Sequence, residues 1–108
     1  MAELEHGAAA PLVVEAEAGG GGPVVKVSGD LDISSVEKLK AVVSSLVQER
    51  PQVLTFELSE LRFMDSAGIA VLLGAVSQVE TVRLRDPTPA VRRLLELTGL
   101  TDVLAIES

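Results

Sequence analysis

The chain has 108 residues, 47% hydrophobic and 23% charged, which is ordinary globular usage and predicts a single domain with an aliphatic core. Nine Lys and Arg against sixteen Asp and Glu give a net charge of −7, which disfavours binding to nucleic acid or to an anionic membrane surface. The sequence has no cysteine for disulfides or nucleophilic chemistry, its N-terminus is acidic, and no apolar run nears the roughly 18 residues that span a bilayer, so we expect a cytoplasmic protein without direct membrane insertion.

The N-terminal part is predicted to form a tail followed by a hairpin. Residues 1–10 are expected to be a flexible acidic tail, and residues 11–108 the folded domain. Glutamates alternate with apolar residues over 12–16, which predicts an exposed edge strand. Four glycines followed by Pro23 predict a tight reversal, so a β-branched strand over 24–28 should return antiparallel.

A first helix is predicted after the pair Gly29-Asp30. Ser34 and Glu37 have the spacing of a capping box, and apolar residues then recur at helical period until Pro51. The other predicted elements are, in chain order, a strand over 53–58, an uncharged helix over 67–76, a strand over 81–85, a helix from Pro89 that stops at Gly99, and a short strand over 103–106.

This alternation predicts a small α/β domain. We expect a mixed, mostly parallel sheet of four to five strands with an N-terminal hairpin and three helices, connected by right-handed crossovers. In such sheets, ligand chemistry gathers in the loops at the carboxyl ends of the strands. Those loops contain Asp30, Asp32, Asp65 and Ser66.

Residues 63–68 place a hydroxyl at the start of the uncharged helix. Backbone N–H groups and the helix dipole favour negative charge there, so a phosphate on Ser66 could be held. The simpler alternative is that Asp65 or Ser66 only caps the helix. We expect Gly68 to keep the approach to Ser66 open. Because the helix is apolar all round, neighbouring helices or a protein partner must cover it.

Other residues are interpreted as structural. Phe63 and Met64 are predicted to pack in the core, and Arg92 and Arg93 to lie on a solvated helix face. A serine hydrolase is disfavoured because no histidine follows Ser66 to act as a base. Three aspartates, Asp30, Asp32 and Asp65, could converge on Mg²⁺, but such residues are more often caps and loop acids, so we expect no metal site.

Three stretches resemble one known family, the STAS domain, and in particular its bacterial anti-sigma-factor antagonists. Residues 27–32 are similar to the acidic loop of that family, residues 61–74 to its phosphoacceptor strand and helix, and residues 89–100 to its third helix. The resemblance covers residues 11–107, and the middle stretch is the specific one.

The resemblance implies a switch without enzyme activity. The unphosphorylated protein would bind an anti-sigma factor with serine kinase activity and release the sigma factor, and phosphorylation of Ser66 would end the binding. The kinase would supply ATP and Mg²⁺, so the chain itself needs no cofactor, and a serine phosphatase would reset the switch. The partner surface implied in this way comprises Asp30, Asp32, Met64, Asp65, Ala67, Gly68, Ile69 and Leu72.

One departure leaves an alternative open. Ala67 stands where many antagonists have a second hydroxyl residue. The resulting sequence Asp65-Ser66-Ala67-Gly68 also resembles STAS subunits of bacterial lipid-transport ABC complexes, which would bind their ATPase without a phosphorylation switch.

Overall fold

The structure is a computed structural model that describes residues 10–107. Its elements, in chain order, are β1 (Val13–Gly19), β2 (Gly22–Leu31), α2 (Val36–Val47), β3 (Val53–Glu57), β4 (Leu61–Met64), α3 (Ser66–Val76), β5 (Thr81–Arg85), α4 (Pro89–Leu97), the short 3-10 helix η1 (Leu100–Asp102) and β6 (Ala105–Glu107).

Within these residues the strands form one six-stranded sheet in the order β1-β2-β3-β5-β6, with β4 beside β2. β1 and β2 form the predicted antiparallel hairpin, and the other pairings are parallel. β2 has ten residues, enough to pair with β3 through Val24–Lys26 and with β4 through Gly29–Leu31. β3 and β4 therefore follow one another along the same side of β2.

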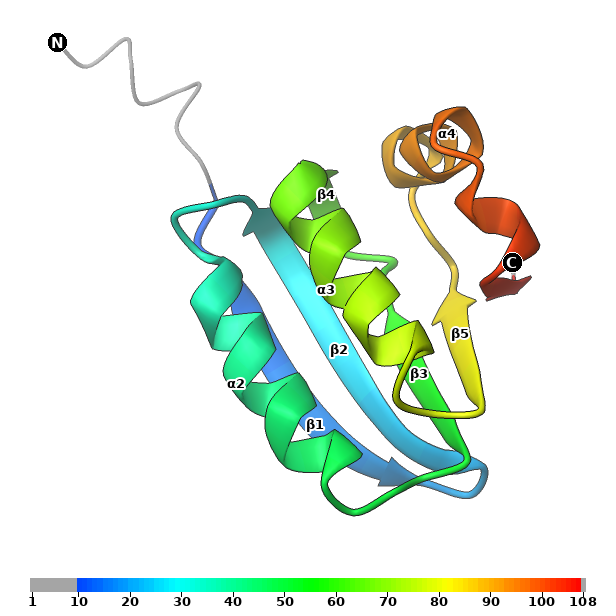
Figure 1. Cartoon of the computed structure of the whole chain (residues 1–108). Coiled ribbons are helices and arrows are strands. Elements are labelled where there is room, and N and C mark those ends of the chain that lie inside the picture. The colour runs from blue at the N-terminus through cyan, green and yellow to red at the C-terminus, as the bar shows by residue number, and fades with distance from the viewer. Residues whose placement is uncertain (1–9, 108) are drawn as a thin grey trace, which may run out of the picture.

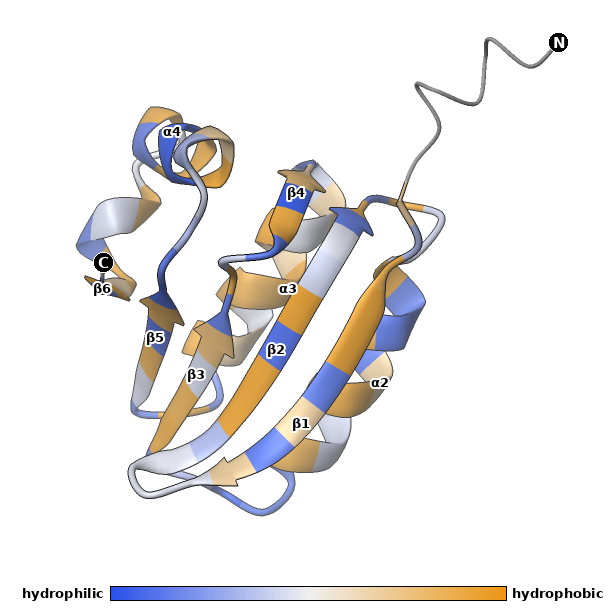
Figure 2. Ribbon diagram, turned by 180° about the vertical axis from the view of Figure 1, so that it is seen from behind, coloured by the Kyte–Doolittle hydropathy of each residue, from blue (hydrophilic) through white to orange (hydrophobic). Residues whose placement is uncertain are grey.

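The helices cover one face of this sheet. α2 and α3 lie side by side across it, and α4 sits beyond the carboxyl end of β5 (Figure 1). The view from behind shows the strands of the opposite face without a helix in front of them (Figure 2). No helix in the described part of the chain is long and apolar enough to cross a membrane.

The core is aliphatic apart from one ring. Along β2 and β5, residues alternate between burial against the helices and exposure on the other face, as expected for strands with one solvated side. The largest fully buried side chains are Phe56, Leu31, Leu39, Leu54, Leu61, Leu72, Leu84, Leu95, Val25, Val27 and Val91.

Charged side chains occupy the open face in a regular row. Strand register aligns Glu15 with Lys26, Lys26 with Glu57, Glu57 with Arg85, and Arg85 with Glu107, so the sign alternates across five strands. The Arg85 Nε atom lies 3.8 Å from a Glu107 carboxylate oxygen. Opposite charges in neighbouring strands support each other, so this face is stable in water without a cover.

The predicted fold class is confirmed, with one strand more than expected. β4 was missed because its burial does not alternate: Leu61 and Met64 are buried, whereas Arg62 and Phe63 between them are exposed. The cause is a β-bulge, at which Gly29 pairs with Leu61 but Asp30 pairs with Phe63, so that two residues of β4 face one of β2.

The start of α2 also differs from the expected capping box. Ser35, not Ser34, is the N-cap residue, and its side chain makes no capping bond. The Oδ1 atom of Asp32 instead accepts the backbone N–H groups of Ser34 (3.0 Å) and Ser35 (3.2 Å). Aspartate side chains readily accept hydrogen bonds from backbone N–H groups two or three residues later. Asp32 therefore provides the hydrogen bonds that a capping side chain would otherwise supply before α2.

Gly29 allows the segment before β1 to lie directly against β2. Its φ of +91° lies in the left-handed region, and a Cβ there would overlap the carbonyl oxygen of Pro11. Ala10 is the first described residue, so the expected flexible tail lies almost wholly outside the described residues.

Candidate functional site

Ser66 is the first residue of α3 and is exposed. Its hydroxyl has no hydrogen-bond partner among residues 10–107, because Asp65 supplies the cap: the Asp65 Oδ1 atom accepts the Ala67 N–H at 2.9 Å. The Asp65 N–H in turn donates to the Leu31 carbonyl at 3.2 Å, which ties the helix start to the end of β2. The capping alternative therefore applies to Asp65, and the Ser66 hydroxyl is open to solvent.

Gly68 has a different role from the one expected. It is buried, and a Cβ there would lie 2.5 Å from Met64 Cγ and 2.7 Å from Leu31 Cδ2. The missing side chain therefore faces inward and does not keep the approach to Ser66 clear. It lets the first turn of α3 lie directly on the ends of β2 and β4, which fixes where Ser66 stands.

Asp32 organises the loop between β2 and α2. Besides the two backbone bonds, its Oδ1 atom accepts the Ser34 hydroxyl at 2.6 Å. The hydrogen bond from the Ser34 side chain is the main cause that lowers the pKa of Asp32, so the carboxylate stays charged at neutral pH. The same loop carries Ile33, whose side chain is 79% exposed.

Asp30 has a structural role. Its side chain is only 12% exposed; Oδ2 accepts the Ala10 N–H at 3.1 Å, and Oδ1 lies 3.8 Å from the Arg62 Nε atom. Oδ1 is buried without a hydrogen bond. This acid, expected at the partner surface, is therefore used to hold the segment that leads into β1.

The other expected surface residues divide by burial. Ala67 and Ile69 are half-buried and remain accessible beside Ser66. Met64 and Leu72 are only 6% and 2% exposed, and Gly68 is buried, so these three lie beneath the surface that they were expected to form. Their positions follow from α3 packing one side against the sheet, a side that an all-apolar helix does not mark in its sequence.

Two exposed apolar residues were not predicted at the carboxyl edge of the sheet, where β2 and β4 end. Ile33 follows β2 and Phe63, 48% exposed, precedes Asp65. The prediction that Phe63 packs in the core is wrong, because the bulge turns both Arg62 and Phe63 outward. Nothing in the local sequence announces that bulge. Ile33 could have been suspected, since it stands between polar residues in a loop.

The acids at this edge do not converge. Asp30 accepts a hydrogen bond from Ala10 and lies near Arg62. Asp32 accepts hydrogen bonds within its own loop, and Asp65 caps α3. Within residues 10–107, no group of three or more His, Cys, Asp or Glu side chains is placed to hold a metal ion. The arrangement places the exposed Ser66 hydroxyl beside the half-buried Ala67 and Ile69, which suits modification and protein contact.

A family model described as "Mlab, STAS domain" matches residues 14–106. The chain belongs to the STAS domain family. Among proteins of this family, it is 32% identical over 82 residues to the anti-sigma F factor antagonist of Lysinibacillus sphaericus, with 71% of this chain and 70% of the relative covered. It is 30% identical over 100 residues to the anti-sigma F factor antagonist of Paenibacillus polymyxa, with 88% and 86% covered.

The fold is shared with solved structures as well. The crystal structure of an anti-sigma factor antagonist from Mycobacterium paratuberculosis superposes with a TM-score of 0.83 at 26% identity, covering 89% of this chain and 85% of that one. The resemblance inferred from the three sequence stretches is thereby confirmed at the level of family and fold.

Proposed function

We propose that the protein is an anti-sigma-factor antagonist, a cytoplasmic binding switch without enzyme activity. In this proposal the unphosphorylated form binds an anti-sigma factor with serine kinase activity, which releases the sigma factor, and phosphorylation of Ser66 ends the binding. The observation that carries it is the exposed Ser66 hydroxyl, which the fold does not use because Asp65 caps α3. The names of the relatives in Lysinibacillus and Paenibacillus support the partner class.

The chemistry at Ser66 belongs to the partner's active site. The kinase transfers the γ-phosphoryl group of its ATP to the Ser66 oxygen, the hydroxyl proton passes to a base of the kinase, and ADP leaves. The product carries about −1.5 to −2 charges at pH 7. The N-terminus of α3 favours that charge within the domain, whereas an apolar interface around it would have to desolvate it. The fold is therefore expected to survive the modification that breaks the complex.

The proposed contact surface is the accessible part of this edge. It comprises Asp32, Ile33, Asp65, Ser66, Ala67 and Ile69. Met64, Gly68 and Leu72 support it from beneath.

The first test is phosphorylation by the anti-sigma factor encoded in the same genome. With ATP and Mg²⁺, mass spectrometry should find one phosphate, on Ser66, and the modified protein should no longer bind the kinase. Ser66→Ala should remain unmodified. Ser77→Ala, at the other end of α3 and also exposed, is the matched control and should be modified normally. Phosphate on the Ser66→Ala protein would refute the assignment, and a serine phosphatase should restore binding.

The second test addresses the apolar surface. Ile33→Asp and Ile69→Asp should each weaken kinase binding by at least tenfold, because a charge would be buried at the interface. Val103→Asp changes an apolar residue that is 52% exposed elsewhere and serves as the control. Thermal melts should remain cooperative. Unchanged binding by Ile33→Asp, the more exposed of the two, would reject this surface.

A second candidate function rests on Ala67, which gives the chain the Asp-Ser-Ala-Gly form. A STAS subunit of a lipid-transport ABC complex would bind its ATPase equally well as Ser66→Ala and as Ser66→Asp. For the antagonist, Ser66→Asp should abolish binding while Ser66→Ala keeps it. The pair of variants therefore separates the two functions.

A further inference from the structure

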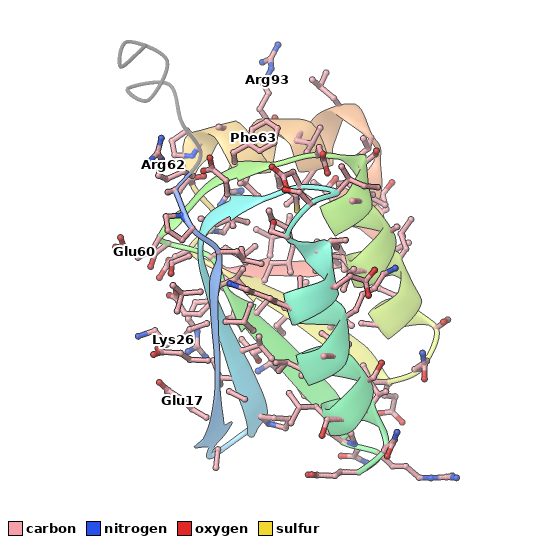
Figure 3. All side chains as sticks on the ribbon, turned by 90° about the vertical axis from the view of Figure 1, so that its left-hand side faces the viewer. Glu17, Lys26, Glu60, Arg62, Phe63 and Arg93 are labelled. Carbon is pink, nitrogen blue, oxygen red and sulfur yellow. The ribbon has the colours of Figure 1, made fainter. Side chains whose placement is uncertain are left out.

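The bulge in β4 creates a second exposed surface at the carboxyl edge of the sheet. Because Arg62 and Phe63 together face Asp30, both side chains point outward, with Arg62 63% and Phe63 48% exposed. Arg93 is exposed on α4, which packs against β4, and its side chain rises above the Phe63 ring in Figure 3. We call Arg62, Phe63 and Arg93 the basic aromatic patch.

The charges of this patch are poorly compensated within the domain. Arg62 has one acidic neighbour, Asp30, at 3.8 Å, which is beyond hydrogen-bond distance. Arg93 has no ion pair among residues 10–107. The exposed Phe63 ring follows Arg62 in β4, and β4 packs against the helix that carries Arg93, so two cations gather near one aromatic ring on a chain with a net charge of −7. This combination suits a ligand in which an apolar side chain lies between carboxylates.

The chain's own N-terminal residues have that pattern. Residues 3–5 read Glu-Leu-Glu, and residues 1–9 contain no Lys or Arg. The residue to which they are joined is fixed at the patch: the Ala10 N–H donates to Asp30 Oδ2 at 3.1 Å, and the Asp30 N–H donates to the Ala10 carbonyl at 3.1 Å. Asp30 is the same residue that pairs with Phe63 and lies next to Arg62.

We propose that Glu3-Leu4-Glu5 docks on the basic aromatic patch of its own chain. Leu4 would lie against Phe63, and the two glutamates would pair with Arg62 and Arg93. Five residue steps from Ala10 let Glu5 reach at most roughly 17 Å, which confines the segment to the edge where it is joined. Such a short link gives an effective concentration in the millimolar range, so a weak contact is populated.

The contact has a consequence that rests on the proposed function. Two residues of the patch, Arg62 and Phe63, lie in β4, and Ser66 follows them at the start of α3, so the patch adjoins the phosphorylation site along the chain. A docked acidic segment would therefore obstruct a partner that approaches Ser66 across Phe63. Removal of residues 2–9 is expected to raise the rate of Ser66 phosphorylation severalfold, and the intact segment acts as a brake on the switch.

The docking itself is tested by NMR on the isolated full chain, without any partner. In a protein with Glu3→Lys and Glu5→Lys, the amide signals of Arg62, Phe63 and Arg93 should move to the positions found after deletion of residues 2–9. The docked population should fall about fivefold or more, since two attractions become repulsions. Addition of 1 M NaCl to the unchanged protein should move the same signals in the same direction.

The matched control changes the net charge equally at a different place. Glu49→Lys with Glu80→Lys alters two exposed acids that flank the opposite edge of the sheet, and it should leave the three signals unmoved. If the deletion leaves these signals where they are, the proposal is overturned. Signals that shift with protein concentration would overturn it too, because the occupant would then be a second copy. Neither result depends on whether Ser66 is phosphorylated.

Discussion

The carboxyl edge of the sheet and its open face are both solvent-exposed, and they differ in how their side chains are satisfied. On the open face, Lys26 and Arg85 stand in register with acids on both neighbouring strands. At the edge, Ile33 and Phe63 expose apolar surface, and the Ser66 hydroxyl has no hydrogen-bond partner among the described residues. Exposure alone therefore does not mark a functional surface here.

This contrast indicates where a partner would gain free energy by binding. Covering the open face would desolvate several charges that already have partners, which costs more than new contacts return. Covering the edge would remove apolar surface from water, at about 25 cal/mol per Å². The side chains beneath the edge, such as Leu72, are buried, whereas those of the charged row are exposed or half-buried. Substitutions beneath the edge should consequently have large effects, and substitutions on the open face small ones.

The largest effect is expected beneath α3. Leu72→Ala should lower the free energy of unfolding by about 2–5 kcal/mol, because its side chain is 2% exposed and its removal leaves a cavity. Leu73→Ala is the control: the adjacent side chain is 42% exposed and should cost under about 1 kcal/mol. Urea unfolding of both variants measures the contrast. Equal losses would mean that α3 does not pack as described.

Gly68 should come next in size. Gly68→Val should cost about 1–3 kcal/mol, since the new atoms meet Met64 and Leu31. Gly74→Ala, in the same helix but with nothing within 4 Å of the added Cβ, should stabilise the protein by about 0.5–1 kcal/mol. The two variants should therefore shift the denaturation midpoint in opposite directions. A neutral Gly68→Val would show that α3 can move away from the strands.

Regular elements of this fold were predictable because their signals are local. The glycine-rich reversal and Pro23 specify the hairpin, and helical periodicity specifies α2 and α4. β4 could not be recognised, because its bulge depends on pairing with Asp30, about 30 residues earlier in the chain, and breaks the alternation by which strands are identified.

In the candidate site, too, features set by the local sequence were predictable and features set by tertiary packing were not. The position of Ser66 at a helix start followed from its place between a strand and an apolar segment. The inward direction of Gly68 and the exposure of Phe63 did not follow, since both are set by how α3 and β4 lie on β2. In an all-apolar helix, no polar residue marks the side that faces water.

A smaller difference in unfolding free energy is expected between variants of the helix cap, Asp65, and of the proposed phosphoacceptor, Ser66. Asp65→Ala should cost about 0.5–2 kcal/mol, because the Ala67 N–H loses its acceptor. Ser66→Ala should stay within about 0.5 kcal/mol of the unchanged protein, since its hydroxyl has no hydrogen-bond partner among residues 10–107. Thermal unfolding of the two variants gives the comparison directly. A Ser66→Ala loss as large as that of Asp65→Ala would show that the hydroxyl has a structural role.

The smallest effect is expected on the open face. Arg85 and Glu107 lie 3.8 Å apart with side chains 43% exposed, so water screens their attraction. Arg85→Gln should therefore cost under about 1 kcal/mol, and the difference from the unchanged protein should shrink further in 1 M NaCl. Arg50→Gln, which removes an exposed cation without an ion pair among residues 10–107, is the reference for the loss of charge alone. If Arg85→Gln destabilised as strongly as Gly68→Val, the charged row would be a structural element in its own right, and the contrast between edge and face would fail.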